Sequence, residues 1–288
     1  MLVRSVRVRF AVVMDTAINA TIGIIFIRKI GKRLIGKDGG KNVPKSMIKR
    51  IITAGPLVME AVYSVSSVRD GTRVRQGKSA LSSRAKQRMN FIYAWQKLKL
   101  LIAANFGPKD IFVTLTYSDE RLPPGRREVM RDISVFTKSL RRERKGKELR
   151  YIYVIEHKHD AGRWHVHILI NASGDDYERI RRLWGRGNVE FRKIRVDREK
   201  HYETLARYLC KEQRDRPGLR LWSGSRNLKK PERDSFRVDA DTTLRAPPKG
   251  KALLLAEETV VNPYGKFRYI EYVMLAGLPR PKRSRRRR

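Results

Sequence analysis

Two histidines at alternate positions of an apolar segment are the residues of this sequence best suited to chemistry. His165 and His167 lie in RWHVHILIN, residues 163–171, and the 288-residue chain contains five histidines. Alternate residues of a β-strand point to the same face, so a strand here makes the two imidazoles neighbours. Two imidazoles at this spacing suit one metal ion. The ordinary alternative is a pair of exposed or hydrogen-bonded strand histidines.

A carboxylate on the preceding predicted strand adds a third ligand to this pair. If the turn between the two strands is centred on Ala161 and Gly162, Glu156 lies directly opposite His167 and shares its face. We therefore expect Glu156 and both histidines to bind one divalent metal, Mg²⁺ or Mn²⁺, with open positions for water or phosphate. A shift of one residue in register would turn Glu156 to the other face. Glu156 would then end its strand and pair with a nearby basic residue.

A tyrosine and a lysine further along the chain share one helical face. They are Tyr208 and Lys211 of the segment YLCK, and residues three apart are neighbours on a helix. A phenol, with a pKa near 10, attacks a phosphodiester only if a cation or a base stabilises the phenolate. We expect Lys211 and the metal to do this for Tyr208. The alternative is a tyrosine that packs under the sheet.

The elements that must position these residues alternate in a regular order. After a helix over residues 84–104, periodicity and β-branched content predict strands at 110–118, 149–157, 163–171 and 188–196 and helices at 126–144, 175–187 and 199–213. The order strand-helix-strand-strand-helix-strand is that of a ferredoxin-like α+β fold, an antiparallel sheet with helices on one face. Its first and third strands form the central pair, so the histidines are expected on a central strand, with the tyrosine helix following the sheet.

Three segments in this order resemble the motifs of the HUH endonucleases, which include the replication initiators of rolling-circle plasmids and phages. They are FVTLTY (112–117), RWHVHILIN (163–171) and YLCK (208–211), and WSGSRNLKKP (222–231) is similar to a segment that follows the tyrosine helix in such initiators. The resemblance implies a metal-dependent nickase that joins the 5′ phosphate to Tyr208 and leaves a 3′ hydroxyl that primes replication. Tyr202 lies on another side of the same helix, so one active tyrosine is expected.

The charge of the chain indicates its partner. Lys and Arg number 66 against 29 Asp and Glu, which makes the net charge +37. Such a field favours polyanions, and nucleic acid gains affinity by releasing counterions. We expect single-stranded DNA at a replication origin as the partner. Because the sequence has no Walker-type phosphate loop, we also expect a host helicase and polymerase.

The segments outside the predicted endonuclease domain, residues 84–231, are basic. Residues 10–27 are mostly apolar and are either a membrane anchor or a packing extension, but Asp15 and Asn19 in their middle argue against a bilayer, so no stable membrane partner is expected. Residues 1–83 are assigned as an N-terminal extension and linker, with residues 31–85 flexible, and residues 232–288 as a C-terminal extension with a basic tail. One cysteine, Cys210, excludes an intrachain disulfide and fits the cytoplasm.

Two other functions remain open. One is a non-catalytic nucleic-acid-binding protein, although RNA-binding proteins of this fold place aromatic residues on the central strands, where this chain has histidines. The other is an HUH relaxase or transposase of a mobile element. Relaxases commonly place the tyrosine before the histidines, and here it follows them. Small transposases lack long basic flanks.

Overall fold

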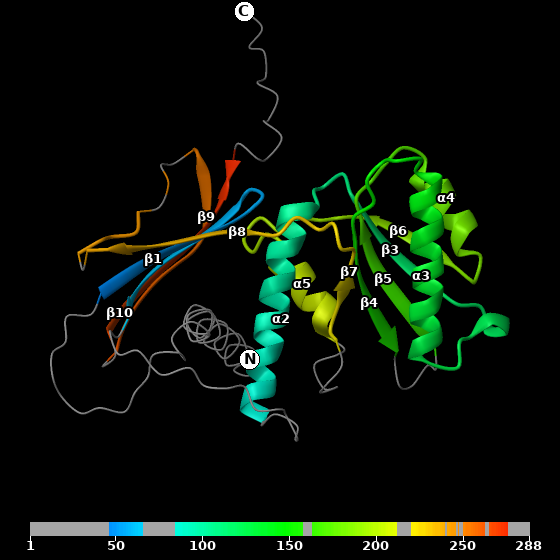
Figure 1. Cartoon of the computed structure of the whole chain (residues 1–288), viewed down its shortest axis with the longest axis horizontal. Coiled ribbons are helices and arrows are strands. Elements are labelled where there is room, and N and C mark those ends of the chain that lie inside the picture. The colour runs from blue at the N-terminus through cyan, green and yellow to red at the C-terminus, as the bar shows by residue number, and fades with distance from the viewer. Residues whose placement is uncertain are drawn as a thin grey trace, which may run out of the picture. The chain divides into compact units, whose positions relative to one another are not determined.

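The computed structural model describes residues 46–65, 84–157, 163–211, 220–239, 241–245, 247, 250–262 and 265–275. The chain divides into two compact units, one comprising Ala94–Lys230 and the other the described residues up to Tyr93 and from Pro231 onward. Each unit holds an antiparallel five-stranded sheet, and four α-helices lie among the described residues (Figure 1). The fold class is therefore α+β, as predicted.

The sheet of the unit Ala94–Lys230 has the strand order β6-β3-β5-β4-β7. Its strands are β3 (Ile111–Thr116), β4 (Tyr151–His157), β5 (Trp164–Ile170), β6 (Val189–Lys193) and β7 (Ser223–Gly224). Strands β3 and β5 lie at the centre, and every neighbouring pair is antiparallel. This is the order expected of a ferredoxin-like sheet, with the histidine strand β5 in the central pair and the short strand β7 added at one edge.

Two helices cover one face of this sheet. They are α3 (Arg126–Glu143) and α4 (Asp176–Trp184), and both lie on the same side of the sheet in Figure 1. The predicted apolar stripe of α3 is buried, and it packs with α4 and the inward side chains of the strands in a core that includes Val113, Leu115, Val129, Ile133, Phe136, Leu140, Val166, Ile168, Ile180 and Trp184. The short helix α4 ends at Gly185, whose φ of 52° lies in the left-handed region that favours glycine.

The opposite face of the sheet carries the histidines and receives helix α5 (Glu203–Cys210). This helix also contacts α2 (Arg84–Asn105): the Arg207 guanidinium lies 4.5 Å from the centre of the Trp95 ring, and Lys99 Nζ lies 3.6 Å from a Glu203 carboxylate oxygen. The two helices of the ferredoxin-like unit therefore share one face as predicted. The added helix lies on the other face, where it can reach the predicted site.

The second sheet has the order β8-β1-β2-β10-β9. Its strands are β1 (Ser46–Ala54), β2 (Leu57–Val65), β8 (Glu232–Val238), β9 (Ala252–Asn262) and β10 (Gly265–Met274). The prediction of a flexible linker over residues 31–85 was therefore wrong for residues 46–65. These residues form a hairpin through Gly55 (φ 60°) and bury apolar side chains such as Ile52 and Leu57. The partner strands β8 and β10 come from the other end of the chain, so no local pattern announces them.

Two predicted segments lie outside the described residues: the apolar segment 10–27 and the basic tail. In the part of the chain that is described, no helix is both long and apolar enough to cross a bilayer. The expectations for both segments stay predictions.

Candidate active site

His167 is held from several sides on the face opposite the main core. Its Nε2 lies 2.6 Å from Glu156 Oε2, and its Nδ1 lies 3.1 Å from Thr114 Oγ1 on the neighbouring strand. The Phe112 ring stacks on the imidazole, with ring centroids 5.6 Å apart. The side chain is 8% exposed. A ring whose two nitrogens are both engaged has a fixed orientation, which is what a metal ligand or a catalytic histidine requires.

The pairing of β4 with β5 corrects the predicted register. Glu156 lies opposite His165, and His167 lies opposite Val154. The predicted direct pairing of Glu156 with His167 was therefore wrong by two residues. An even shift leaves every side chain on its face, so Glu156 still reaches His167 on the diagonal. The alternation of apolar and polar residues is unchanged by a shift of two, and for this reason it cannot distinguish the two registers.

The three predicted metal ligands share a face without being gathered at one point. Over the described ranges, no three His, Cys, Asp or Glu side chains are arranged to hold a metal ion. Glu156 and His167 instead hydrogen-bond through atoms that would bind a metal. The donor types fit a divalent ion, because an imidazole that donates Nδ1–H to the Thr114 hydroxyl presents Nε2 as a ligand. Metal binding would have to replace the Glu156–His167 hydrogen bond.

Helix α5 brings Tyr208 to this histidine face. The Tyr208 and His167 rings meet edge to face with centroids 6.0 Å apart, and Tyr208 is 51% exposed. The buried residues Ala206, Leu209 and Cys210 fix the orientation of the helix. Tyr208 is therefore held beside the histidines and remains accessible to a substrate, rather than packed under the sheet.

The other two residues of the predicted tyrosine segment have different surroundings. Lys211 is the C-terminal cap of α5, and its backbone N–H donates to the Tyr208 carbonyl, while its side chain is exposed. Tyr202 precedes α5 and is 2% exposed, and its hydroxyl donates to the Phe106 carbonyl at 2.9 Å. Burial raises the pKa of the Tyr202 phenol to about 12. Tyr202 is thus a structural anchor, which leaves Tyr208 as the tyrosine of this helix that faces the histidines.

An arginine near Tyr208 was missed by sequence reasoning. Arg192 of β6 lies opposite Phe112, and Glu190 of the same strand lies opposite Thr114, so both share the histidine face. The hydrogen bond and charge of Glu190 raise the pKa of the Arg192 guanidinium, and Tyr208 adds a smaller electrostatic contribution. The alternation of Glu190 and Arg192 in a predicted strand was a usable signal, but it acquires meaning only once β6 is known to pair with β3.

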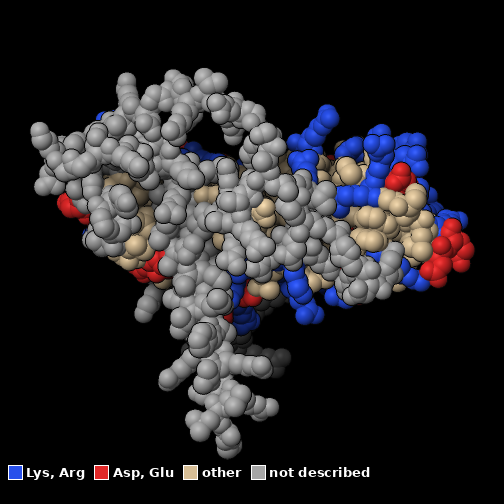
Figure 2. All heavy atoms as spheres, turned by 90° about the horizontal axis from the view of Figure 1, so that it is seen from below, with Lys and Arg blue, Asp and Glu red and all other residues tan. Residues whose placement is uncertain are grey.

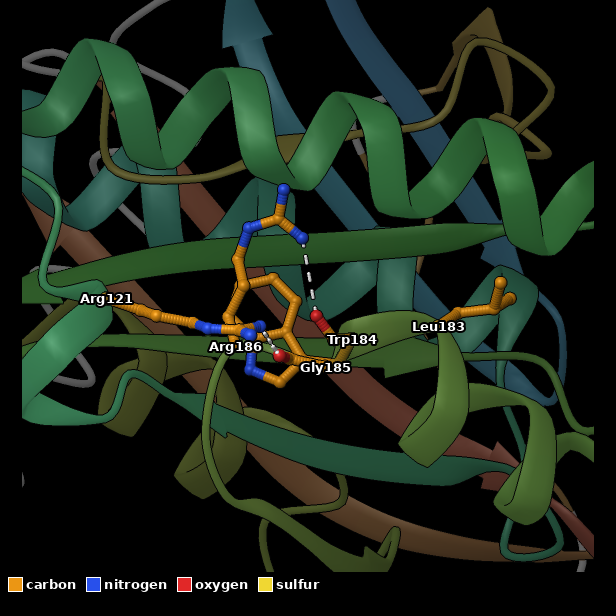
Figure 3. Close-up of a pocket in the computed structure, with 5 residues that line it drawn as sticks. All are labelled: Arg121, Leu183, Trp184, Gly185 and Arg186. Carbon is orange, nitrogen blue, oxygen red and sulfur yellow. Dashed lines mark hydrogen bonds between the residues drawn. The ribbon is translucent and has the colours of Figure 1, made fainter.

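A hollow of about 450 Å³ lies away from the histidine face, where α4 ends. It is lined by Arg121, Leu183, Trp184, Gly185 and Arg186 (Figure 3). The Arg121 guanidinium donates to the Gly185 carbonyl, and that of Arg186 donates to the Trp184 carbonyl at 3.3 Å. These arginines cap the carbonyl groups at the C-terminus of α4. The lining residues include neither a nucleophile nor a carboxylate, so the hollow is not the catalytic site.

A family model matches the part of the chain that carries the site. This model, described as Replication-associated protein of the ORF2 type, matches residues 110–213, which is less than half of the chain. The matched segment runs from β3 to the end of α5 and contains His165, His167, Glu156, Tyr208 and Lys211. The match supports a replication-associated function and an interaction with DNA. No curated protein and no solved structure matches the chain.

Proposed function

We propose that this protein initiates rolling-circle replication by metal-dependent, site-specific nicking and joining of single-stranded DNA. The observation that carries the proposal is the position of Tyr208, an accessible phenol whose ring lies 6.0 Å from that of His167 on a ferredoxin-like sheet. A nucleophile beside a set of imidazole and carboxylate donors is the arrangement that covalent phosphoryl transfer requires. The match to a replication-associated family gives the reaction its biological setting.

The proposed reaction exchanges one phosphodiester for another. The Tyr208 oxygen attacks the scissile phosphorus, the bond from phosphorus to the 3′ oxygen breaks, and the leaving oxygen takes up a proton to become a 3′ hydroxyl. The 5′ phosphate remains on Tyr208. Attack by a 3′ hydroxyl on this phosphotyrosine reverses the step and joins the strand, so no nucleotide cofactor is consumed.

The residues around Tyr208 prepare this step. When bound by His165, His167 and Glu156, a divalent metal, Mg²⁺ or Mn²⁺, supplies Lewis-acid polarisation of the scissile phosphate. Thr114 and Phe112 hold the His167 ring in place. Lys211, one helical turn beyond Tyr208, is proposed to stabilise the phenolate or the leaving oxygen. A host helicase would open the duplex, and a host polymerase would extend the 3′ end.

The test is the capture of a covalent adduct on Tyr208. The protein is incubated with Mg²⁺ or Mn²⁺ and single-stranded oligonucleotides that tile the DNA on both sides of its own gene. Adducts that survive denaturation are then mapped by peptide mass spectrometry. We expect one nucleotide-bearing peptide, which contains Tyr208, and no adduct from Tyr208→Phe.

The matched control is Tyr202→Phe, which removes a buried hydroxyl from the same region and should form the adduct. An adduct on any residue other than Tyr208 would overturn the assignment of the nucleophile. If no oligonucleotide forms an adduct with either metal, the nicking proposal fails and a non-catalytic DNA-binding protein remains.

A further inference from the structure

The edge strand β6 presents an exposed ion pair on the histidine face. The Arg192 guanidinium donates to Glu190 Oε1 from Nε at 3.0 Å and from Nη2 at 2.7 Å. The two side chains are 66% and 50% exposed. They occupy alternate positions of one strand, so they point the same way. Because an ion pair this exposed contributes little to folding stability, its position near the site invites a functional explanation.

Register places this pair within reach of the proposed reaction. Glu190 lies opposite Thr114, which contacts His167 Nδ1, and Arg192 lies opposite Phe112, which stacks on the same imidazole. Adjacent strands are about 4.8 Å apart, so β6 runs about 10 Å from β5. An extended arginine side chain spans most of that gap. The electrostatic interaction between Arg192 and Tyr208 shows that the guanidinium is on the side of the strand where α5 lies.

We propose that Arg192 binds a backbone phosphate of single-stranded DNA beside Tyr208, and that Glu190 holds the guanidinium until DNA displaces it. The inference rests on the proposed function for its substrate class. It adds a phosphate contact at the β6 edge that lies outside the predicted metal ligands and the predicted Tyr208–Lys211 pair.

The chemistry of the pair fits this exchange. A guanidinium presents parallel N–H groups that match two phosphate oxygens as well as two carboxylate contacts. Glu190 already engages two of those donors, so it occupies the arginine in the way that a phosphate would. Both groups are exposed, and therefore little solvation is lost when one partner replaces the other. Glu190 thus competes with DNA for Arg192 and weakens binding of strands that lack other contacts.

Equilibrium binding in the Tyr208→Phe background tests the inference without any cleavage. Affinity for a short mixed-sequence single strand is measured by fluorescence anisotropy across a range of NaCl concentrations. Arg192→Ala should lower the affinity several-fold and reduce the slope of log K against log salt by about 0.7, the value of one lost single-strand phosphate contact. Glu190→Gln should raise the affinity, and Arg192→Lys should restore the slope without restoring the sensitivity to Glu190.

Two control variants correct for the change in net charge. Arg141→Ala on α3 and Glu178→Gln on α4 each alter one exposed charge on the elements that cover the other face of the sheet. If Arg141→Ala changes the slope as much as Arg192→Ala, or if Arg192→Ala changes nothing, the inference is wrong. It is also wrong if Glu178→Gln and Glu190→Gln raise the affinity equally. Loss of the adduct in the nicking experiment, with these binding results intact, would overturn the proposed reaction alone.

Discussion

At the scale of single residues, the contact between Glu156 and His167 defines the chemistry that the site can support. The 2.6 Å separation of Glu156 Oε2 and His167 Nε2 joins a carboxylate to an imidazole on one face of the sheet, and the side chains are 14% and 9% exposed. Such a pair shares a proton in the absence of metal and presents two donors in its presence. Thr114 Oγ1 at Nδ1 completes the arrangement, because a hydrogen bond at the second nitrogen sets which nitrogen is available to a ligand.

The first prediction concerns the carboxylate. Glu156→Gln keeps the size of the side chain but removes the charge that a divalent ion needs, so Mn²⁺ affinity should fall roughly 10- to 100-fold, the scale known for the loss of supporting groups around metals. Calorimetric titration of Mn²⁺ into the DNA-free protein measures this. Glu178→Gln on α4 is the matched control and should titrate like the wild type. Equal affinities for Glu156→Gln and the wild type would remove Glu156 from the proposed ligands.

At the scale of elements, helix α5 depends on a short set of anchors. Arg207 pairs with Glu203 at 2.7 Å and lies over the Trp95 ring at 4.5 Å, and these contacts join α5 to α2. Tyr202, just before the helix, ties the chain to the Phe106 carbonyl at the end of α2. The position of Tyr208 over the sheet therefore depends on residues that have no chemical role of their own.

The second prediction concerns the Tyr202 anchor. Tyr202→Phe removes one buried hydrogen bond and leaves the Phe106 carbonyl without this donor, so the free energy of unfolding should fall by about 1 kcal/mol. Chemical denaturation followed by circular dichroism measures the change. The nicking adduct should persist, because the ring still fills its site. A variant with unchanged stability would show that the Tyr202 hydroxyl is not an anchor.

The same residue predicts a dependence on pH. The pKa of Tyr202 is about 12 in the folded protein, against about 10 for an unperturbed phenol. A raised pKa favours the neutral phenol in the fold, so the stability that this group contributes is complete below pH 10 and is lost between pH 10 and 12. The stability difference between the wild type and Tyr202→Phe should therefore shrink over that interval. A difference that is constant up to pH 12 would contradict the burial of a neutral phenol.

At the scale of the whole molecule, charge dominates. The net charge is +37, and on the face shown in Figure 2 the Lys and Arg side chains are widespread while Asp and Glu form small patches. A field of this size attracts single-stranded and double-stranded DNA alike, because it acts on the phosphates. General affinity is therefore expected to survive the loss of any one site residue, and specificity must come from the residues around Tyr208.

The third prediction separates affinity from specificity. The tail at residues 280–288 contains six Lys and Arg residues beyond Pro281, namely Lys282, Arg283, Arg285, Arg286, Arg287 and Arg288. Its deletion should flatten the salt dependence of DNA binding, since each lost phosphate contact reduces the slope by about 0.7 to 0.9. The choice of cleavage site among the tiled oligonucleotides should not change. A truncated protein that cleaves elsewhere would show that the tail reads sequence.

Local periodicity was enough to predict the sheet that carries the site. The period of two in RWHVHILIN placed His165 and His167 on one face of a strand, and the stripe at Val129, Ile133 and Phe136 predicted the face that α3 buries. Chain order then placed the histidine strand in the central pair. These features depend on residues close together in the sequence, and side-chain direction follows directly from backbone geometry.

Tertiary structure alone decided which side chains meet across strands and between distant segments. The alternation of β4 and β5 allows registers that differ by two residues, and only packing selected the one that sets Glu156 opposite His165. Arg192 joined the site because β6 pairs with β3, and residues 46–65 became a hairpin because strands near the C-terminus complete their sheet. Hydrogen bonds between strands far apart in sequence leave no local pattern. The sequence by itself therefore determined the types and faces of the site residues, and the tertiary structure determined their neighbours.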